Sequence, residues 1–401
     1  MVSDVEGGSR DMLLAQGPAG DAAPAPATRQ PATADGDRDA SPTPSQSQSD
    51  FLAGLYGRTA ASEPSSRLAG TPNMFGDSYM ESGNGMIVSG PGGFSTSNSP
   101  LAGGNRRLKI AENDNSLPQD RVFFLYNHFQ DAASIDDSTV TPMAQRSISL
   151  DRYMIGFEKT FCDGLWSFEL RMPFGNGYGY ESAGFGSFAG QVGNLDVVLK
   201  RVLYKSETTL AAVGLCVDTP TGSDATGTGQ GVQYDIHNQA LFLMPYLGIL
   251  HVPNDKLFYQ AFLQVDVPTN GNRIDYVDTI GSTSGTFGTL NDQTLMYADL
   301  SVGYWLSRNP CANWVTGLAG VVELHYTTTL QDADIVTGTT SSRFFSFGNF
   351  SNRVDVLDLT VGLHAELGSQ TLCRVAGVVP LRTGDDRLFN GEVQVQLERR
   401  F

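Results

Sequence analysis

The sequence predicts an all-β protein: a closed antiparallel transmembrane β-barrel of about twelve strands between residues 120 and 401. Three observations predict it. Charged residues are only 17% of the chain, below the roughly 25% of soluble domains, and 45 glycines make up part of the difference. After Pro118 the chain becomes a series of period-two runs, as in β-strands. The links between these runs alternate long and short, as in barrels of the bacterial outer membrane.

The charge balance and the hydropathy exclude two other classes of protein. Lys and Arg number 26 against 43 Asp and Glu, for a net charge of −17, whereas nucleic-acid binding requires clustered positive charge. No apolar run reaches the ~18 residues of a membrane helix, and the longest, 240–252, contains Pro245. A chain of this kind crosses a membrane only as a closed barrel, because lipid leaves no partner for open strand edges.

The first 119 residues divide into two parts. Residues 1–67 are predicted to be a disordered tail, since 16–50 consist largely of Ala, Pro, Ser, Gln and Asp. Residues 68–119 are rich in Gly and Ser with short apolar islands, and either plug the barrel or lie in the periplasm. Met1–Arg10 lacks the cationic and apolar regions of a signal peptide. Because a barrel must be exported, we expect a trimmed or misplaced start.

The spanning strands follow in order, each near the ~9–11 residues that a tilted strand needs. Their faces are read from alternation: Leu357, Leu359 and Leu363 share one face of 354–367, opposite Asp358 and His364. The expected strands are 120–129, 149–161, 166–174, 194–204, 208–219, 240–252, 257–269, 295–306, 314–330, 354–367, 372–382 and 392–401.

Link length separates a barrel from a soluble β-sandwich, which shows the same alternation along its strands. Four short links, such as Lys205–Glu207, and a slightly longer one at 307–313 alternate with the long links. An even number of strands that begins and ends on the short-link side fits a barrel without adjustment. The long links are 130–148, 175–193, 220–239, 270–294 and 331–353.

The last strand resembles the C-terminal insertion signal of outer-membrane barrels, an aromatic end preceded by alternating apolar residues. The residues that carry this signal are Val393, Val395, Leu397 and Phe401, whereas Arg399 departs from the pattern. The alternative is an ordinary amphipathic edge strand.

Longer phrases resemble a group of uncharacterised planctomycete-type outer-membrane proteins: Asn115–Phe124, Arg152–Phe174 and Asn194–Lys200. More distantly, Val217–Gly222 and Val265–Asn270 are similar to strand ends in barrels proposed to pass aromatic compounds during phenol degradation. The resemblance runs from about Thr71 to the end. It implies an outer-membrane barrel and a transport role, with no defined solute.

The expected inner wall is polar and has more acids than bases, which predicts a porin-like, cation-preferring channel for passive uptake of small solutes. The distant resemblance implies small aromatic compounds as the other class of solute. A network of paired charges that fills a narrow barrel is the alternative interpretation, since twelve strands lie between filled and open barrels. The pore-lining candidates are Arg152, Glu158, Glu169, Arg171, Asp196, Lys200, Asp218, Asp266, Asp299, Glu323, His325, Asp358, His364 and Glu366.

Other functional classes find less support in the sequence. A structural or surface-interaction barrel stays open as an alternative. An enzyme is not expected, because no Gly-x-Ser-x-Gly elbow occurs and no serine stands in a recognisable frame with a histidine. We expect no cofactor and no metal site. Cys311 and Cys373 are a candidate disulfide on successive short turns. The expected partners are outer-membrane lipid, lipopolysaccharide and the barrel-assembly machinery, with no nucleic acid.

Overall fold

The computed structural model describes residues 67–80, 84–90, 93–99, 102–104, 106–137, 144–175, 178–182, 185–189, 192–229, 231–340, 343–348 and 353–401. The predicted disordered tail, apart from Arg67, lies outside the described residues. Within them, no helix is long and apolar enough to cross a membrane.

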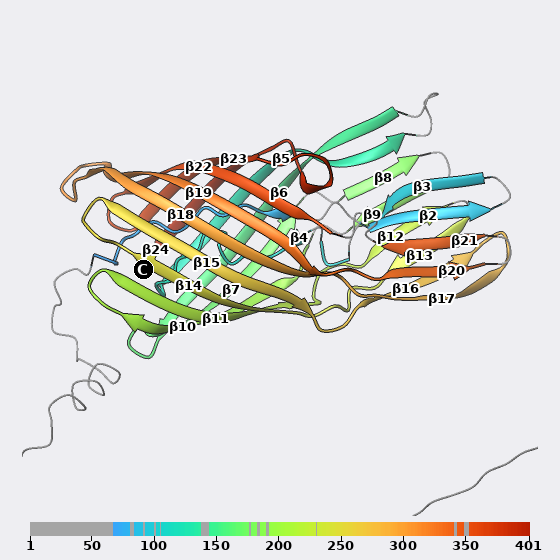
Figure 1. Cartoon of the computed structure of the whole chain (residues 1–401), viewed down its shortest axis with the longest axis horizontal. Coiled ribbons are helices and arrows are strands. Elements are labelled where there is room, and N and C mark those ends of the chain that lie inside the picture. The colour runs from blue at the N-terminus through green and yellow to red at the C-terminus, as the bar shows by residue number, and fades with distance from the viewer. Residues whose placement is uncertain are drawn as a thin grey trace, which may run out of the picture. The chain divides into compact units, whose positions relative to one another are not determined.

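Twelve antiparallel strands close into a barrel, which confirms the predicted fold class. Each lies within or overlaps one of the twelve ranges expected from the sequence, and β5 and β6 extend well beyond theirs (Figure 1). The barrel strands are β5 (Arg121–Asp137), β6 (Ala144–Phe161), β7 (Trp166–Gly175), β10 (Leu195–Lys205), β11 (Thr209–Thr219), β14 (Phe242–His251), β15 (Leu257–Pro268), β18 (Thr294–Arg308), β19 (Val315–Gln331), β22 (Asp355–Leu367), β23 (Thr371–Pro380) and β24 (Gly391–Arg400).

The barrel wall follows the period of two read from the sequence. In β24, outward Val393 and Leu397 are 49% and 45% exposed, whereas Gln394 and Gln396 between them are buried. The closing pair joins β24 to β5 over ten residue pairs, from Gly391 opposite Gln130 to Arg400 opposite Arg121. In this strand, apolar residues therefore lie on the outside of the barrel and polar residues on its inside.

The long links were expected only as connections, but eight further strands form inside them. Together with a hairpin from the N-terminal region they build two sheets beyond the long-link end of the barrel, which we call the crown (Figure 1). The six-stranded sheet holds β8 (Tyr178–Ser182), β9 (Phe185–Ala189), β12 (Ala225–Gly229), β13 (Val232–Ile236), β16 (Asn272–Asp278) and β17 (Thr283–Leu290). The four-stranded sheet holds β20 (Ile335–Thr339), β21 (Phe344–Gly348), β2 (Asn84–Gly90) and β3 (Gly93–Ser99).

The two crown sheets share one apolar core. Tyr234 of the larger sheet meets Phe347 of the smaller sheet edge to face, with ring centroids 5.1 Å apart. Phe287 contacts the rings of Phe345 and Phe347 at 5.1 and 5.4 Å. Ile274 and Leu290 complete the buried cluster. The crown is therefore a folded β-sandwich, because each sheet buries an apolar face against the other.

Residues 67–78 and 106–119 occupy the barrel interior, and we call them the luminal segment. The luminal segment begins near the short links, where Arg67 Nε lies 3.2 Å from Asp255 Oδ1. The first pass (67–78) leads to the β2–β3 hairpin in the crown, where β2 pairs with β21. The second pass (106–119) returns to the start of β5, and the bridge β1 (Tyr79–Met80) to β4 (Arg106–Arg107) joins the two passes. The chain thus runs through its own barrel twice.

Candidate functional site

The candidate site is the barrel lumen. Thirteen of the fourteen candidate residues are buried, with exposed fractions of 9% or less. Glu366 is partly buried near the short-link end, where its carboxylate lies 3.9 Å from Arg308. All fourteen thus turn away from the outer surface. A role in lining a solute path stays a prediction, because the luminal segment occupies the same space.

One charged cluster surrounds Asp114 of the second pass. Lys200 Nζ lies 2.6 Å from Asp114 Oδ1, and Arg171 donates to the Glu112 carbonyl at 2.9 Å. Arg121 is at its centre, within 3.4 Å of four carboxylates; these belong to Asp114, Glu158, Glu169 and Glu398. Wall residues from distant parts of the sequence therefore meet around one acid of the luminal segment.

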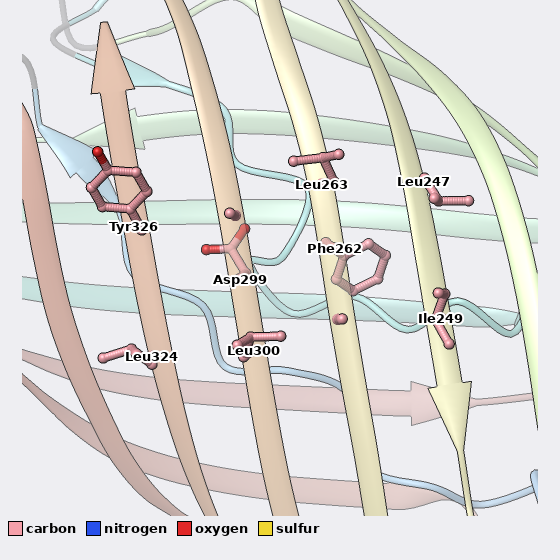
Figure 2. A pocket seen from close by; sticks show the side chains of 10 residues that line it. Leu247, Ile249, Phe262, Leu263, Asp299, Leu300, Leu324 and Tyr326 are labelled. Carbon is pink, nitrogen blue, oxygen red and sulfur yellow. The ribbon is translucent and has the colours of Figure 1, made fainter.

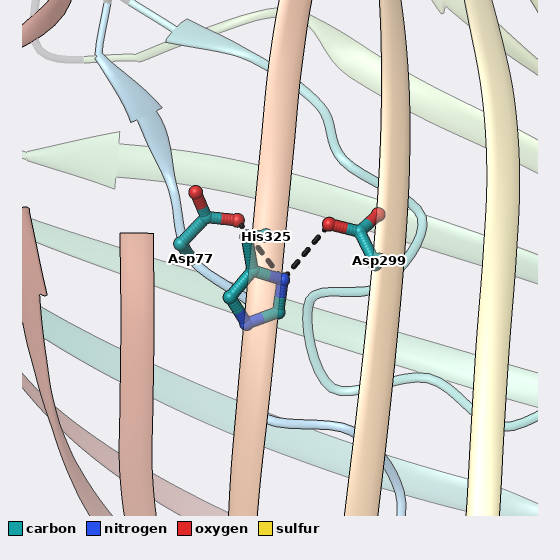
Figure 3. Close-up of side chains that lie close together, drawn as sticks. All are labelled: Asp77, Asp299 and His325. Carbon is teal, nitrogen blue, oxygen red and sulfur yellow. Dashed lines mark hydrogen bonds and ion pairs between the residues drawn. The ribbon is translucent and has the colours of Figure 1, made fainter. Parts of the chain in front are cut away.

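A second cluster surrounds Asp77 of the first pass (Figure 3). His325 Nδ1 lies 2.8 Å from Asp299 Oδ1 and 3.4 Å from Asp77 Oδ1. Lys109 of the second pass pairs with Asp77 and lies 3.3 Å from Asp299. Asp358 of β22 lies directly opposite His325 in the barrel wall. This cluster therefore joins both passes to the wall.

Wall side chains also hold the backbone of the luminal segment. The Glu323 carboxylate accepts the N–H groups of Phe75 at 2.9 Å and of Gly76 at 2.8 Å. Arg374 donates to the Asn73 and Met74 carbonyls and lies 4.0 Å above the Phe75 ring. Gly76 has a φ of +75°, and a Cβ there would stand 2.7 Å from the Glu112 backbone. Only glycine fits where the two passes touch.

Apolar contacts add to this grip. Met74, Leu108 and Ile110 pack against inward aromatic residues of the wall in one buried cluster, among them Phe123, Phe242 and Phe262. Leu68 belongs to a second cluster near the short links. The luminal segment is therefore fitted to the wall by packing as well as by charge.

The remaining candidates are distributed along the lumen. Asp196 and Asp218 lie directly opposite each other on β10 and β11, and Asp266 pairs with Arg107 at 2.8 Å. The guanidinium of Arg152 lies 5.8 Å from the centre of the Phe129 ring.

The two inward histidines belong to different surroundings. His325 belongs to the Asp77 cluster, whereas His364 meets the edge of the Trp305 ring, with centroids 5.7 Å apart. Along β22, His364 lies six positions from Asp358, the residue paired with His325. The two histidines therefore do not form one site.

The predicted disulfide is wrong, because Cys311 and Cys373 are both free. Cys311 lies in the β18–β19 turn, and Cys373 lies on β23, opposite Ala365 and Leu397. The strands β19 and β22 separate these positions in the barrel order. At about 4.8 Å per strand, that separation exceeds the ~7 Å limit between bridged Cα atoms.

The residues of the terminal signal all face outward, as expected. Phe401 stacks on Phe157 with ring centroids 6.1 Å apart, and its N–H donates to the Asp120 carbonyl at 3.2 Å. The departure at Arg399 also has an explanation. Its guanidinium reaches the Thr371 and Gln370 side chains at 3.0 Å each, so the charge lies at the rim.

Several important residues escaped the sequence analysis. Arg121, Arg374 and Glu398 occupy inward positions of strands that the sequence did predict, so their alternation could have identified them. Asp77, Lys109 and Asp114 gave no such signal, because a segment without regular structure has no period to read.

A hollow of about 330 Å³ lies on the other side of the wall (Figure 2). Outward leucines of β14, β15, β18 and β19 surround it, and the small side chains of Ala261 and Ala298 lie at its base. It is an apolar depression in the outer face, separated from the charged lumen by the barrel wall.

Comparisons with solved structures return outer-membrane channels, porins and transporters at low similarity. No family model and no curated protein matches the chain. An outer membrane channel from Pseudomonas putida F1 is similar at 10% identity and a TM-score of 0.46, over 74% of this chain and 100% of that one. The NanC porin is similar at 7% identity and a TM-score of 0.38, over 70% of this chain and 98% of that one. The Ralstonia pickettii toluene transporter TbuX is similar at 11% identity and a TM-score of 0.36, over 71% of this chain and 90% of that one.

Proposed function

We propose that this protein is an outer-membrane channel for small solutes and that its luminal segment closes the barrel at rest. One observation carries the proposal. The barrel has an apolar outside and a charged inside, and the chain within it is held by noncovalent contacts. A charged lumen suits water and solutes once that segment moves.

The membrane location is supported by the outer face of the wall. Leu300, Val361 and Leu363 are each more than half exposed, and similar residues surround the barrel. Such a surface is costly in water and favourable in lipid. Because the barrel closes, each strand finds a hydrogen-bonding neighbour on both sides, as lipid requires.

The solute class is supported by the balance of luminal charge. Nine of the fourteen candidate residues are acids, against three Arg or Lys. Excess carboxylates favour small cations over anions once the path is open. Absence of enzymatic activity is part of the same proposal.

A removable crosslink tests the closing role of the luminal segment. An ideal Cβ at Gly248 of β14 stands 2.6 Å from the Ser116 Oγ, so a Ser116→Cys, Gly248→Cys pair is close enough for a disulfide. The pair is built in a chain whose four native cysteines are replaced by alanine. In liposome swelling, we expect solute entry when the disulfide is reduced and little entry when it is oxidised.

The outcomes of that experiment separate the alternatives. Ser116→Cys alone serves as the control and should swell equally in both redox states. Equal swelling of the double variant in both states contradicts closure by the luminal segment. No swelling in any state, by correctly folded protein, favours the second candidate: a surface-interaction barrel. The crown supports that candidate, since it presents a folded β-structure at the long-link end of the barrel.

A further inference from the structure

Three inward residues form a row across neighbouring strands of the wall. Asp299 of β18 lies directly opposite His325 of β19, which lies directly opposite Asp358 of β22. Residues paired in this way have Cβ atoms about 4.5–5.5 Å apart. Asp77 of the luminal segment faces the row, and all four side chains are buried. The fold therefore brings the His325 imidazole together with the carboxylates of Asp77 and Asp299 (Figure 3), and Asp358 lies opposite His325 on the next strand.

The spacing of these groups suits a single metal ion. The ligand atoms of Asp77, Asp299 and His325 all lie within 4.8 Å of one another. Metal–ligand bonds of about 2.0–2.2 Å place two ligands of a tetrahedral ion roughly 3.4 Å apart. His325 Nδ1 and Asp77 Oδ1 are separated by 3.4 Å. The 2.8 Å from Nδ1 to Asp299 Oδ1 is shorter, but Asp299 Oδ2 has no hydrogen-bond partner among the described residues.

The other nitrogen of the histidine lies beside a further carboxylate. His325 Nε2 is 3.2 Å from Glu323 Oε2, although it makes no hydrogen bond among the described residues. Metal-binding histidines characteristically donate their second N–H to a carboxylate. The tautomer with its N–H on Nε2 leaves the Nδ1 lone pair free for an ion held by Asp77 and Asp299.

The charge of the cluster also calls for a cation. Lys109 is the lysine in contact with Asp77 and Asp299, whereas the acids number three with Asp358. Asp358 is 1% exposed, and its Oδ1 has no hydrogen-bond partner among the described residues. An uncompensated buried charge costs several kcal/mol.

We propose that Asp77, Asp299 and His325 bind one divalent first-row transition-metal ion, which fastens the luminal segment to the barrel wall. Asp358, opposite His325 on β22, adds a further negative charge beside the ion. A nitrogen donor together with carboxylate oxygens suits ions such as Zn²⁺ or Mn²⁺, whereas Ca²⁺ prefers oxygen alone. Lys109 stays beside the carboxylates and balances part of their charge. Binding of the ion does not depend on the proposed channel function. Only an effect of the ion on solute entry would depend on it.

Metal retention by the full-length, detergent-extracted protein tests the site. The protein is stripped with a chelator, incubated with Zn²⁺, Mn²⁺ or Ca²⁺, passed through gel filtration and analysed for metal. We expect about one Zn²⁺ or Mn²⁺ per chain and no retained Ca²⁺. His325→Gln and Asp77→Asn should each weaken binding by at least tenfold. A heat-modifiability gel verifies that each variant still forms a barrel.

Two control variants locate the ion. Asp218→Asn removes another buried luminal acid, and His237→Gln removes a crown histidine that lies beside Asp224 and Asp275. Both should retain metal like the wild type. Loss of metal in His237→Gln, or equal retention in His325→Gln, overturns the proposal. So does a wild-type chain that retains no metal, because a protonated His325 beside Lys109 then balances the acids.

Discussion

Arg121 shows how one side chain joins the barrel to the segment inside it. Its guanidinium lies within 3.4 Å of four carboxylates, and it also donates to the Asn113 carbonyl at 2.6 Å. Three of these acids belong to barrel strands and one to the second pass. A buried cation with this many partners is costly to remove, since the acids keep their burial and lose their counter-charge.

We therefore expect Arg121→Met to destabilise the protein by about 3–5 kcal/mol, as for other broken buried pairs. Urea unfolding in detergent micelles, followed by tryptophan fluorescence, measures the change. Arg399→Met on the outer rim is the matched control, and should stay within about 0.5 kcal/mol of the wild type. An equal loss of unfolding free energy in both variants would show that the network around Arg121 adds no more stability than a surface arginine.

His237 of the crown gives this part of the protein a stability that depends on pH. Partial burial lowers the pKa of His237, but hydrogen bonds to Asp224 and Asp275 outweigh burial and raise the pKa above its ordinary value of 6.5. A raised pKa means that the folded crown binds the proton more tightly than the unfolded chain does. That stabilisation is complete below about pH 6.5 and is lost as the pH rises through the folded pKa.

The expected result is a crown that opens more readily as the pH rises above 6.5. Hydrogen exchange of the crown strands across this pH range measures the opening. In His237→Gln the exchange, corrected for its intrinsic pH dependence, should become flat over the same range. A pH response that survives this substitution would assign the effect to another group.

At the scale of elements, the crown depends on strands that the sequence did not reveal. Phe347 of β21 is fully buried between the rings of Tyr234 and Phe287. Its strand also pairs with β2, so it joins the hairpin between the two luminal passes to the rest of the crown. Loss of this side chain should weaken the crown without touching the barrel.

We expect Phe347→Ala to cost the crown about 3–5 kcal/mol, the usual range for a buried Phe→Ala. Proteinase K applied to intact cells should then cleave the crown, whereas the heat-modifiability of the barrel stays unchanged. Phe344→Ala serves as the control, because Phe344 lies on the same strand but is 42% exposed. Concurrent loss of barrel stability would mean that crown and barrel fold as one unit.

The barrel strands were predictable from sequence because lipid outside and a polar lumen inside impose a strict period of two. The apolar residues, such as Leu359, mark the face toward lipid, and the polar residues, such as Asp358, mark the face toward the lumen. The crown strands were not predictable, since strands such as β8 and β12 have five residues and consist mostly of Gly, Ser, Thr and Tyr. The path of the luminal segment depends on contacts such as Asp114 with Lys200, whose partners lie 86 positions apart.

For the whole molecule, opening requires the luminal segment to break its contacts with the wall, and several of these contacts are individually strong. Glu323 accepts two backbone N–H groups of the first pass, and hydrogen bonds to charged groups contribute about 1.5–3 kcal/mol each. Glu323→Gln should therefore shift the balance toward the open channel. In planar bilayers we expect the Glu323→Gln channel to open at least about tenfold more often than the wild type. Glu207→Gln in an exposed short link is the control and should behave like the wild type.

The ion preference of the open channel follows from which charges remain on the wall. When the luminal segment moves, Lys109 and Arg107 leave with it, and they now pair with wall acids Asp299 and Asp266. The opposed carboxylates of Asp196 and Asp218 stay at the long-link end of the path. Asp77 and Asp114 leave with the same segment and release wall bases such as Lys200, so the preference for cations comes from the excess of acids on the wall itself. In asymmetric salt, Glu323→Gln channels should give a cation-directed reversal potential, which Asp218→Asn should reduce. An anion-directed potential would contradict both the preference and this account of opening.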